Sequence, residues 1–280
     1  MNVLVFTVLI WLGSVLAGFL GSLTGLGGGI IIIPLLTMVF GVDIRYAIGA
    51  SLVSVIATSS GAAAAYVKEG FSNIRIGMFL EIATTVGALA GASLALRLPT
   101  SLIALIFGVV LLYSAYLSSR VENQSLCTGK PDRLGTALKM NGSYPSAEGM
   151  KSYNVCSVPA GFGLMFIAGS ISGLLGIGSG AVKVLAMDRA MRLPFKVSTA
   201  TSNFMIGVTA AASAGIYLNK GYIDPGLTMP VILGVLLGAS LGARHLLEAK
   251  TKKLRIIFGI VIFILALEMI YSGLKGGILR

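Results

Sequence analysis

The sequence predicts an all-α polytopic membrane protein built from two inverted-topology repeats of about five membrane segments each. The first observation is composition: of 280 residues, 56% are hydrophobic and only 11% are charged, whereas a soluble domain carries about 25% charged residues. The second is that charge-free stretches of about 18 residues or more, the length that crosses a bilayer, recur along the chain. The third observation is an internal repeat.

The repeat relates the two halves of the chain by a constant shift of 151 positions. Small and aromatic residues coincide without gaps: Gly25, Gly27 and Gly29 with Gly176, Gly178 and Gly180, Tyr66 with Tyr217, and Phe107-Gly108 with Phe258-Gly259. A single match means little, but one shift that serves the whole half indicates an internal duplication.

Each half contains five apolar segments, of which the second is short. They lie near residues 3–22, 24–40, 46–67, 76–97 and 101–118 in the first half, and near 156–174, 177–187, 197–218, 226–243 and 254–273 in the second. The first segment lacks the basic start and the cleavage site of a signal peptide, so we assign it to the membrane. The predicted units are a first membrane repeat at 1–118, a polar cytoplasmic linker at 119–155 without helical periodicity, and a second membrane repeat at 156–280.

The basic residues predict the orientation. The net charge is +11, but Lys and Arg lie mostly in short loops, where they set membrane orientation rather than bind nucleic acid. If each half crosses the membrane an odd number of times, fifteen Lys and Arg fall on one side and five on the other, with Lys183 left inside a segment. If the first two segments of a half make one crossing, the split is ten against ten. The cytoplasmic face collects basic residues, so we predict the odd count, an inverted second half, and both termini outside the cell (inner) membrane.

The short second segment of each half begins at a glycine cluster, in "GSLTGLGGGIIIIPLL" at 21–36 and "SGLLGIGSGAVKVLAM" at 172–187. Interrupted segments at matching positions of inverted repeats indicate a substrate site near the midplane of the membrane. We expect these segments to be broken or re-entrant, with helices restarting at about Gly28 and Ser179. Their first-turn amides suit a small anion. The alternative is that the glycines only let helices pack closely.

The motifs "GLGGGIIIIP", "GLLGIGSGAVKV" and "ATSNFMIGVTAAASAG" resemble those of the TauE/SafE sulfite exporter family, and the resemblance spans nearly the whole chain. It implies a membrane permease for sulfite, sulfoacetate or related sulfur anions, and it does not fix the cargo, because substrates vary within the family. Two departures stand out. Ser179 replaces the middle glycine of the second motif, and Leu185 aligns with Pro34, which leaves open whether the two halves bend alike.

Lys183 follows the second glycine cluster by about one helical turn. An ionisable residue at membrane depth is a functional candidate, and a lysine beside a helix N-terminus is repelled by the helix dipole unless an anion lies between them. We therefore expect Lys183 to be a charge partner of the anion. The alternative is that its side chain snorkels toward the basic loop at 188–196.

Hydroxyl and amide side chains follow in the next segment, "VSTATSNFMIGVT", and in its counterpart, "AIGASLVSVIATSSG". Asn203 can donate to a sulfoxyl oxygen, although serine and threonine in membrane helices often bond their own backbone. Glu81 is the candidate for carrying a coupling ion, and it can equally sit neutral or pair with a basic residue. The predicted substrate-binding residues are Thr24, Gly25, Gly27, Gly28, Gly29, Ser51, Ser54, Gly176, Gly178, Ser179, Gly180, Lys183, Thr201, Ser202 and Asn203.

These features predict a secondary transporter that moves small sulfur-containing oxyanions by alternating access. The partners expected are the lipid bilayer and a small anion such as sulfite, thiosulfate or an organosulfonate. The alternatives are an anion channel and a cation-coupled transporter of another small organic anion. The direction, the coupling ion (H⁺ or Na⁺) and the oligomeric state are left open.

An enzyme is not predicted, because the sequence has no phosphate loop, no HExxH and no Cys/His cluster. We therefore expect no catalytic residue, no cofactor and no metal site. Cys127 and Cys156 fit neither a disulfide framework nor a CxxC spacing, which predicts two ordinary thiols.

Overall fold

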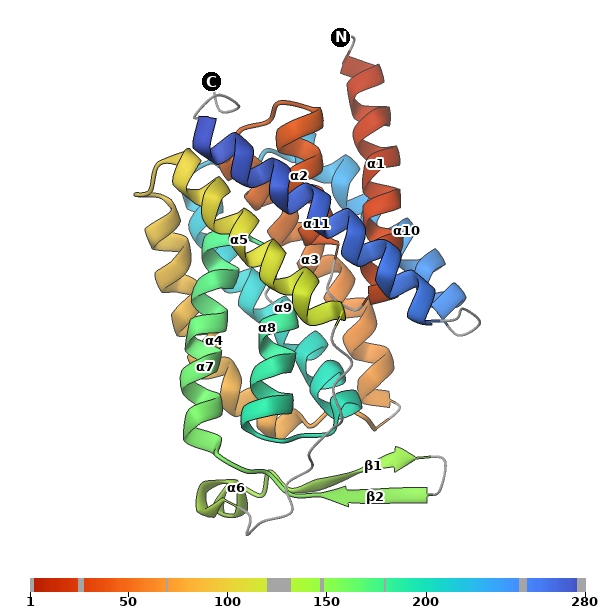
Figure 1. The fold of residues 1–280 in the computed structure, drawn as a ribbon, viewed down its shortest axis with the longest axis vertical. Coiled ribbons are helices and arrows are strands. Elements are labelled where there is room, and N and C mark those ends of the chain that lie inside the picture. The colour runs from red at the N-terminus through yellow and green to blue at the C-terminus, as the bar shows by residue number, and fades with distance from the viewer. Residues whose placement is uncertain are drawn as a thin grey trace.

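The computed structural model describes residues 3–24, 28–68, 70–119, 132–146, 149–178, 180–246 and 251–275, and most of them are helical. The helices pack side by side in one bundle (Figure 1). The first half contains α1 (Val3–Thr24), α2 (Gly29–Pro34), the π-helical turn η1 (Leu35–Val39), α3 (Ile44–Lys68), α4 (Ile74–Ala95) and α5 (Thr100–Ser119). The second contains α7 (Val158–Leu175), α8 (Gly180–Leu185), the π-helical turn η2 (Ala186–Ala190), α9 (Phe195–Asn219), α10 (Pro225–Leu246) and α11 (Thr251–Lys275).

The helix boundaries repeat with the same shift as the sequence. Both ends of α3 and α9, of α4 and α10, and of the two π turns lie 151 positions apart, as do the first residues of α2 and α8. The π turns show that the proline is not required for this geometry. Pro34 precedes η1 and Leu185 precedes η2, yet the two turns cover matching residues. The two halves therefore bend alike at this position.

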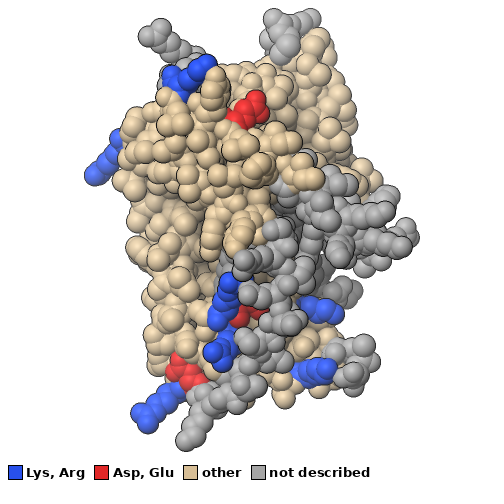
Figure 2. Space-filling view, in the orientation of Figure 1, with Lys and Arg blue, Asp and Glu red and all other residues tan. Residues whose placement is uncertain are grey.

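The outer surface of the bundle is apolar over much of its height. Large side chains such as Leu16, Met78, Ile82 and Phe263 are exposed on it, and Figure 2 shows the charged side chains of the described residues in an upper and a lower group. Within the described part of the chain, two helices are long and apolar enough to cross a membrane, α4 and α7. Shorter apolar helices lie at Leu4–Leu20, Gly29–Val39, Ile44–Ser60, Thr100–Tyr116 and Pro225–Leu241.

The two halves are joined by reciprocal helix pairs. Helix α1 packs on α10 and its counterpart α7 packs on α4, while α3 packs on α9 and α5 on α11. Glycines make the closest approaches: a Cβ added at Gly238 would lie 2.0 Å from the carbonyl oxygen of Val15, and one at Gly87 would lie 2.2 Å from that of Phe166. These two contacts are related by the 151-residue shift. Small residues therefore bring the helix backbones into direct contact here.

The linker contains structure that the sequence did not predict. It forms a short helix, α6 (Arg133–Ala137), and an antiparallel hairpin of β1 (Gly142–Ser146) and β2 (Gly149–Tyr153), which lies at one end of the bundle (Figure 1). Asp132 ties the linker to the start of α7, because its carboxylate accepts hydrogen bonds from the backbone N–H groups of Leu134 at 3.1 Å and Val158 at 2.7 Å. The linker residues Met140 and Tyr153 are buried in one apolar cluster with residues of α4, α7 and η2.

The prediction of two ordinary thiols is wrong for Cys156, which is disulfide-bonded. Cys127, the other cysteine of the chain, lies outside the described residues. Spacing failed here because two cysteines this far apart in sequence carry no pattern, and only the folded linker decides which sulfur atoms meet. The backbone N–H of Cys156 also donates to the carbonyl of Met191 at 3.1 Å, which ties the end of the linker to the turn before α9.

Candidate functional site

The second glycine cluster interrupts the helices. Helix α7 ends at Leu175, Gly176 and Gly178 adopt left-handed backbone with φ of +69° and +71°, and α8 begins at Gly180. A Cβ at Gly176 would also lie 2.7 Å from Cγ2 of Ile48, so conformation and space both require glycine there. In the first half, α1 ends at Thr24 and α2 begins at Gly29. Three predicted site residues lie outside the described residues: Gly25, Gly27 and Ser179.

The structure brings three of the predicted residues together across the two halves. The Ser51 hydroxyl on α3 donates to the carbonyl oxygen of Gly176 at 2.8 Å, and both residues are buried. Gly29 lies against the same point, because an added Cβ would be 2.6 Å from the Ser51 hydroxyl and 3.3 Å from the Gly176 carbonyl. Gly28 precedes it as the N-cap of α2 and makes no side-chain capping bond. The start of α2 therefore meets the break that precedes α8.

The other predicted polar side chains on α3 and α9 do not all lie at the glycine break. The Ser202 hydroxyl donates to the carbonyl of Gly180 at 3.4 Å, beside the start of α8. The Ser54 hydroxyl donates to the backbone of Ser51 at 2.7 Å, within its own helix. The Thr201 hydroxyl accepts from the backbone N–H of Asn73 at 3.0 Å, so it contacts the start of α4 rather than the glycine break. Asn203 is half-buried on α9.

Lys183 is fully buried, with 0% of its side chain exposed, so it does not snorkel. Its ammonium group donates to the hydroxyl of Thr209 on α9. That hydroxyl donates in turn to Oε1 of Glu81 on α4 at 2.7 Å, and Oε1 also accepts from Thr85 at 3.2 Å. Glu81 is 8% exposed, and its Oε2 is buried with no hydrogen-bond partner among the described atoms. In the described part of the chain, Lys183 and Glu81 are the two buried charged side chains.

Sequence reasoning missed Thr209, which joins the lysine to the carboxylate. One signal was available, since Thr209 follows Ser202 by seven residues, or two helical turns, and such residues share a helix face. Which neighbouring helix that face meets depends on the packing of α9 against α4, which the sequence of α9 does not contain.

Two cation–aromatic contacts mark opposite ends of α9. The Arg45 guanidinium, at the start of α3, lies 5.8 Å from the ring centre of Tyr222, just beyond the end of α9. The Lys196 ammonium, at the start of α9, lies 5.8 Å from the ring centre of Phe71, just beyond the end of α3. The two contacts are related by the 151-residue shift. The packed helices α3 and α9 therefore run in opposite directions.

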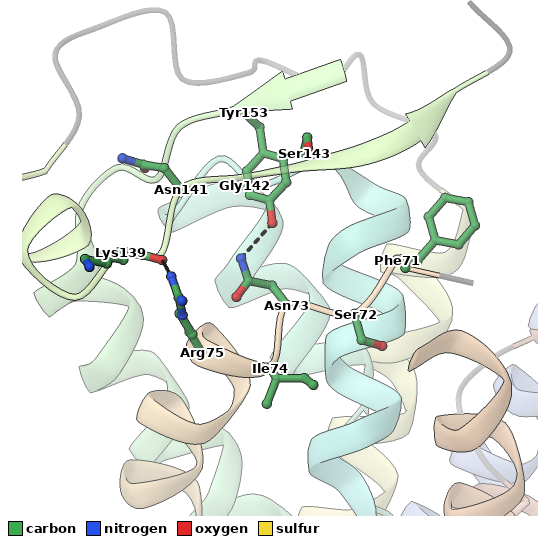
Figure 3. Close-up of a pocket in the computed structure, with 11 residues that line it drawn as sticks. Phe71, Ser72, Asn73, Ile74, Arg75, Lys139, Asn141, Gly142, Ser143 and Tyr153 are labelled. Carbon is green, nitrogen blue, oxygen red and sulfur yellow. Dashed lines mark hydrogen bonds between the residues drawn. The ribbon is translucent and has the colours of Figure 1, made fainter. Parts of the chain in front are cut away.

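A separate polar hollow of 290 Å³ lies between the linker and the start of α4 (Figure 3). Asn73 points into it and donates to the phenol of Tyr153 at 2.7 Å, while Arg75 donates to the backbone carbonyl of Lys139 at 3.0 Å. Burial raises the pKa of the Tyr153 phenol above its usual value, and the Asn73 hydrogen bond opposes this shift. The hydrogen bonds across the hollow hold the linker against the bundle, and Lys183 does not line it.

The chain is similar in sequence to one protein family and to several proteins named membrane transporters. The family model described as "Sulfite exporter TauE/SafE" matches residues 10–269. A probable membrane transporter protein of Bacillus subtilis, YunE, is 28% identical over 96% of this chain and 98% of its own length. A second from the same organism, YdhB, is 27% identical over 86% and 89%. A probable membrane transporter protein of Xylella fastidiosa is 26% identical over 92% of each chain. No solved structure matches the chain at a significant level.

Proposed function

Because the chain belongs to the TauE/SafE sulfite exporter family, we propose that it is a secondary transporter that moves small sulfur-containing oxyanions such as sulfite across the cell membrane. Its relatives are named membrane transporters, which favours transport over catalysis. The observation that carries the proposal is Lys183, a fully buried cation three residues after the start of the helix that follows a glycine break. Its buried counter-charge among the described residues is Glu81, reached through the Thr209 hydroxyl, and a transported anion can replace that carboxylate beside the cation.

The proposed mechanism is alternating access by two inverted halves. The opposite directions of α3 and α9, equivalent helices that pack together, support this arrangement. So does the position of the chain ends, since α1 begins and α11 ends at one end of the bundle while the linker hairpin lies at the other (Figure 1). In such folds the substrate site lies between the repeats, at their interrupted segments. Rocking of one half against the other then exposes that site to each side in turn.

The proposed anion site lies where the start of α2 meets the break before α8. Lys183 supplies the positive charge, and the Ser51 and Ser202 hydroxyls lie beside the break and beside the start of α8. The backbone that leaves the helix here offers amide groups that cannot remain unpaired in lipid, and an oxyanion accepts from such groups. The half-buried amide of Asn203 is placed one residue from Ser202 and completes the proposed set.

The orientation is proposed from the loop charges. Fifteen Lys and Arg on the linker side against five on the side of the termini put the linker in the cytoplasm and both termini outside. The disulfide at Cys156 opposes this assignment, because disulfides are typical of oxidising compartments. We favour the charge distribution because it sums over the whole chain, whereas the disulfide is one bond.

The experiment that tests the function is exchange in proteoliposomes. We expect labelled sulfite to enter vesicles that contain unlabelled sulfite, at a rate that saturates with concentration. A channel would pass anions without saturation or exchange, and a Na⁺-coupled carrier of another anion would ignore sulfite. Sulfate, thiosulfate and sulfoacetate, added as competitors, rank the substrates.

The matched variants test the site. Lys183→Ala and Asn203→Ala should lose exchange while the protein still inserts and elutes as one folded species. Lys183→Gln keeps a hydrogen-bond donor for the Thr209 hydroxyl, so this variant separates the loss of the charge from a folding defect. Lys220→Ala removes an exposed lysine at the turn after α9 and should exchange normally. Normal sulfite affinity in a folded Lys183→Gln protein would remove Lys183 from the site.

A further inference from the structure

The two buried charged side chains of the described residues, Glu81 and Lys183, are linked through Thr209 and connect the two halves of the chain. Glu81 lies on α4 of the first half, and Lys183 and Thr209 lie on α8 and α9 of the second. The Thr209 hydroxyl accepts from the ammonium and donates to the carboxylate at 2.7 Å, so the two charges are joined through one oxygen atom. Both charged side chains are more than nine-tenths buried, so each depends on the other for its counter-charge.

The duplicated fold does not need these charges. The 151-residue shift places Ile32 where Lys183 lies in the other half, Thr58 at the place of Thr209, and Ile232 at the place of Glu81. Ile32 is fully buried, like Lys183. Burial of an ion pair costs desolvation free energy, and apolar residues of similar volume often replace such pairs at no loss of stability. The charged pair therefore has a purpose other than packing.

We propose that Glu81 carries one proton with each transported monoanion, which makes the protein a proton-coupled anion carrier. This inference rests on the proposed function, since it assumes that the anion binds at Lys183. At rest the ammonium and the carboxylate sum to zero. When a monoanion reaches Lys183 it replaces Glu81 as the counter-charge, which leaves one excess negative charge in a buried site. A proton from the water on the open side then forms an O–H bond with the carboxylate and restores neutrality.

The structure shows which oxygen of Glu81 can take the proton and which hydrogen bond can change once the carboxyl group is neutral. Oε2 of Glu81 is buried and has no hydrogen-bond partner among the described atoms, so it is the oxygen that takes the proton. The Thr209 hydroxyl has a second acceptor, the backbone carbonyl of Met205 at 3.0 Å. Once Glu81 is neutral, the hydroxyl can turn to Met205 and loosen its contact with the carboxyl group. On the other side of the membrane the anion leaves, and Glu81 releases the proton to water and pairs with Lys183 again.

Other titratable groups do not compete for this role. Helix α4 packs against α7 and α9, and α7 contains no titratable side chain. On α9 the titratable residues are Lys196 and Tyr217. Lys196 lies over Phe71 at one end of the helix, and the Tyr217 phenol lies within hydrogen-bond distance of the carbonyls of Gly173 and Leu174. Lys183 is therefore the cation that faces Glu81.

The test measures uphill uptake of labelled sulfite into proteoliposomes under an imposed pH gradient, with the membrane voltage clamped and protein-free vesicles as the blank. Buffers near neutral pH keep neutral sulfur dioxide, which crosses lipid by itself, negligible, while part of the sulfite is present as the monoanion hydrogensulfite. The wild-type protein should accumulate sulfite on the alkaline side and acidify the lumen as it does so. Glu81→Gln should lose both effects and still exchange labelled for unlabelled sulfite at equal pH. Glu268→Gln, which changes an exposed carboxylate on α11, should behave as wild type.

The outcomes separate the two proposals. Saturable exchange in the wild type together with unchanged pH-driven uptake in Glu81→Gln overturns the coupling inference and leaves the transport proposal intact. Uptake driven by a Na⁺ gradient instead of a pH gradient overturns it as well. If the wild-type protein shows no saturable flux of any sulfur anion, the proposed function fails first and the inference fails with it.

Discussion

The contact between Gly29 and Ser51 provides a quantitative test of how the start of α2 meets the break before α8. A Cβ added by Gly29→Ala would lie 2.6 Å from the Ser51 hydroxyl and 3.1 Å from Cγ2 of Val55. The methyl group must displace the hydroxyl that donates to the buried Gly176 carbonyl at 2.8 Å. Overpacking costs about 1–3 kcal/mol, and loss of the hydrogen bond costs about 1 kcal/mol more. We expect Gly29→Ala to destabilise the protein by about 2–4 kcal/mol.

A double-mutant cycle distinguishes this contact from a general effect of the methyl group. Ser51→Ala alone should cost about 1 kcal/mol through the lost hydrogen bond. In the Ser51→Ala background the hydroxyl is already absent, so Gly29→Ala should cost about 1–2 kcal/mol less than it does in the wild type. Unfolding in detergent, followed by intrinsic fluorescence, measures each step. Gly163→Ala is the control, because nothing lies within 4 Å of its added Cβ. Additive effects of Gly29→Ala and Ser51→Ala would refute the contact.

Three further predictions address packing, the linker and the buried relay. Gly238→Ala should lower the midpoint of thermal unfolding, because its methyl group would lie 2.0 Å from the Val15 carbonyl oxygen. Gly215→Ala should not lower it, because nothing lies within 4 Å of the added Cβ. Equal midpoints for the two variants would contradict the close approach of the helices at Gly238. Cys156 should react with a maleimide only after its disulfide is reduced. A phosphine that cannot cross the membrane should reduce this disulfide in inverted vesicles but not in intact cells, and the reverse result would place the linker outside. Thr209→Val should lose pH-driven sulfite uptake and Thr209→Ser should retain it, because only serine keeps the hydroxyl between Lys183 and the carboxylate. Unchanged pH-driven uptake by the valine variant would contradict that role.

The helices of the fold were predictable because each one is encoded locally. Apolar length, glycine breaks and the 151-residue shift placed all ten segments close to where the helices lie. The structure of the linker was not predictable in this way. Residues 133–153 carry no strong periodicity, and their helix and hairpin are held by contacts with Asn73, Arg75 and Val158, which lie outside the linker.

The candidate site was predictable in part. A lysine after a glycine cluster can be singled out in the sequence, but its burial and its link to Glu81 through Thr209 cannot, since the three residues come from three helices. The predicted hydroxyl side chains make different contacts, because they lie on different helix faces. Ser51 and Ser202 reach the breaks, whereas Ser54 bonds its own helix and Thr201 contacts the loop before α4.

We propose that Lys183, the buried cation on the helix that follows the glycine break at Gly176 and Gly178, binds the transported anion. Sulfite-dependent thermal stabilisation of the purified protein, compared between wild type and Lys183→Gln, tests it most directly. We expect a saturable increase in the unfolding temperature for wild type and none for Lys183→Gln. An equal increase in both proteins would contradict it.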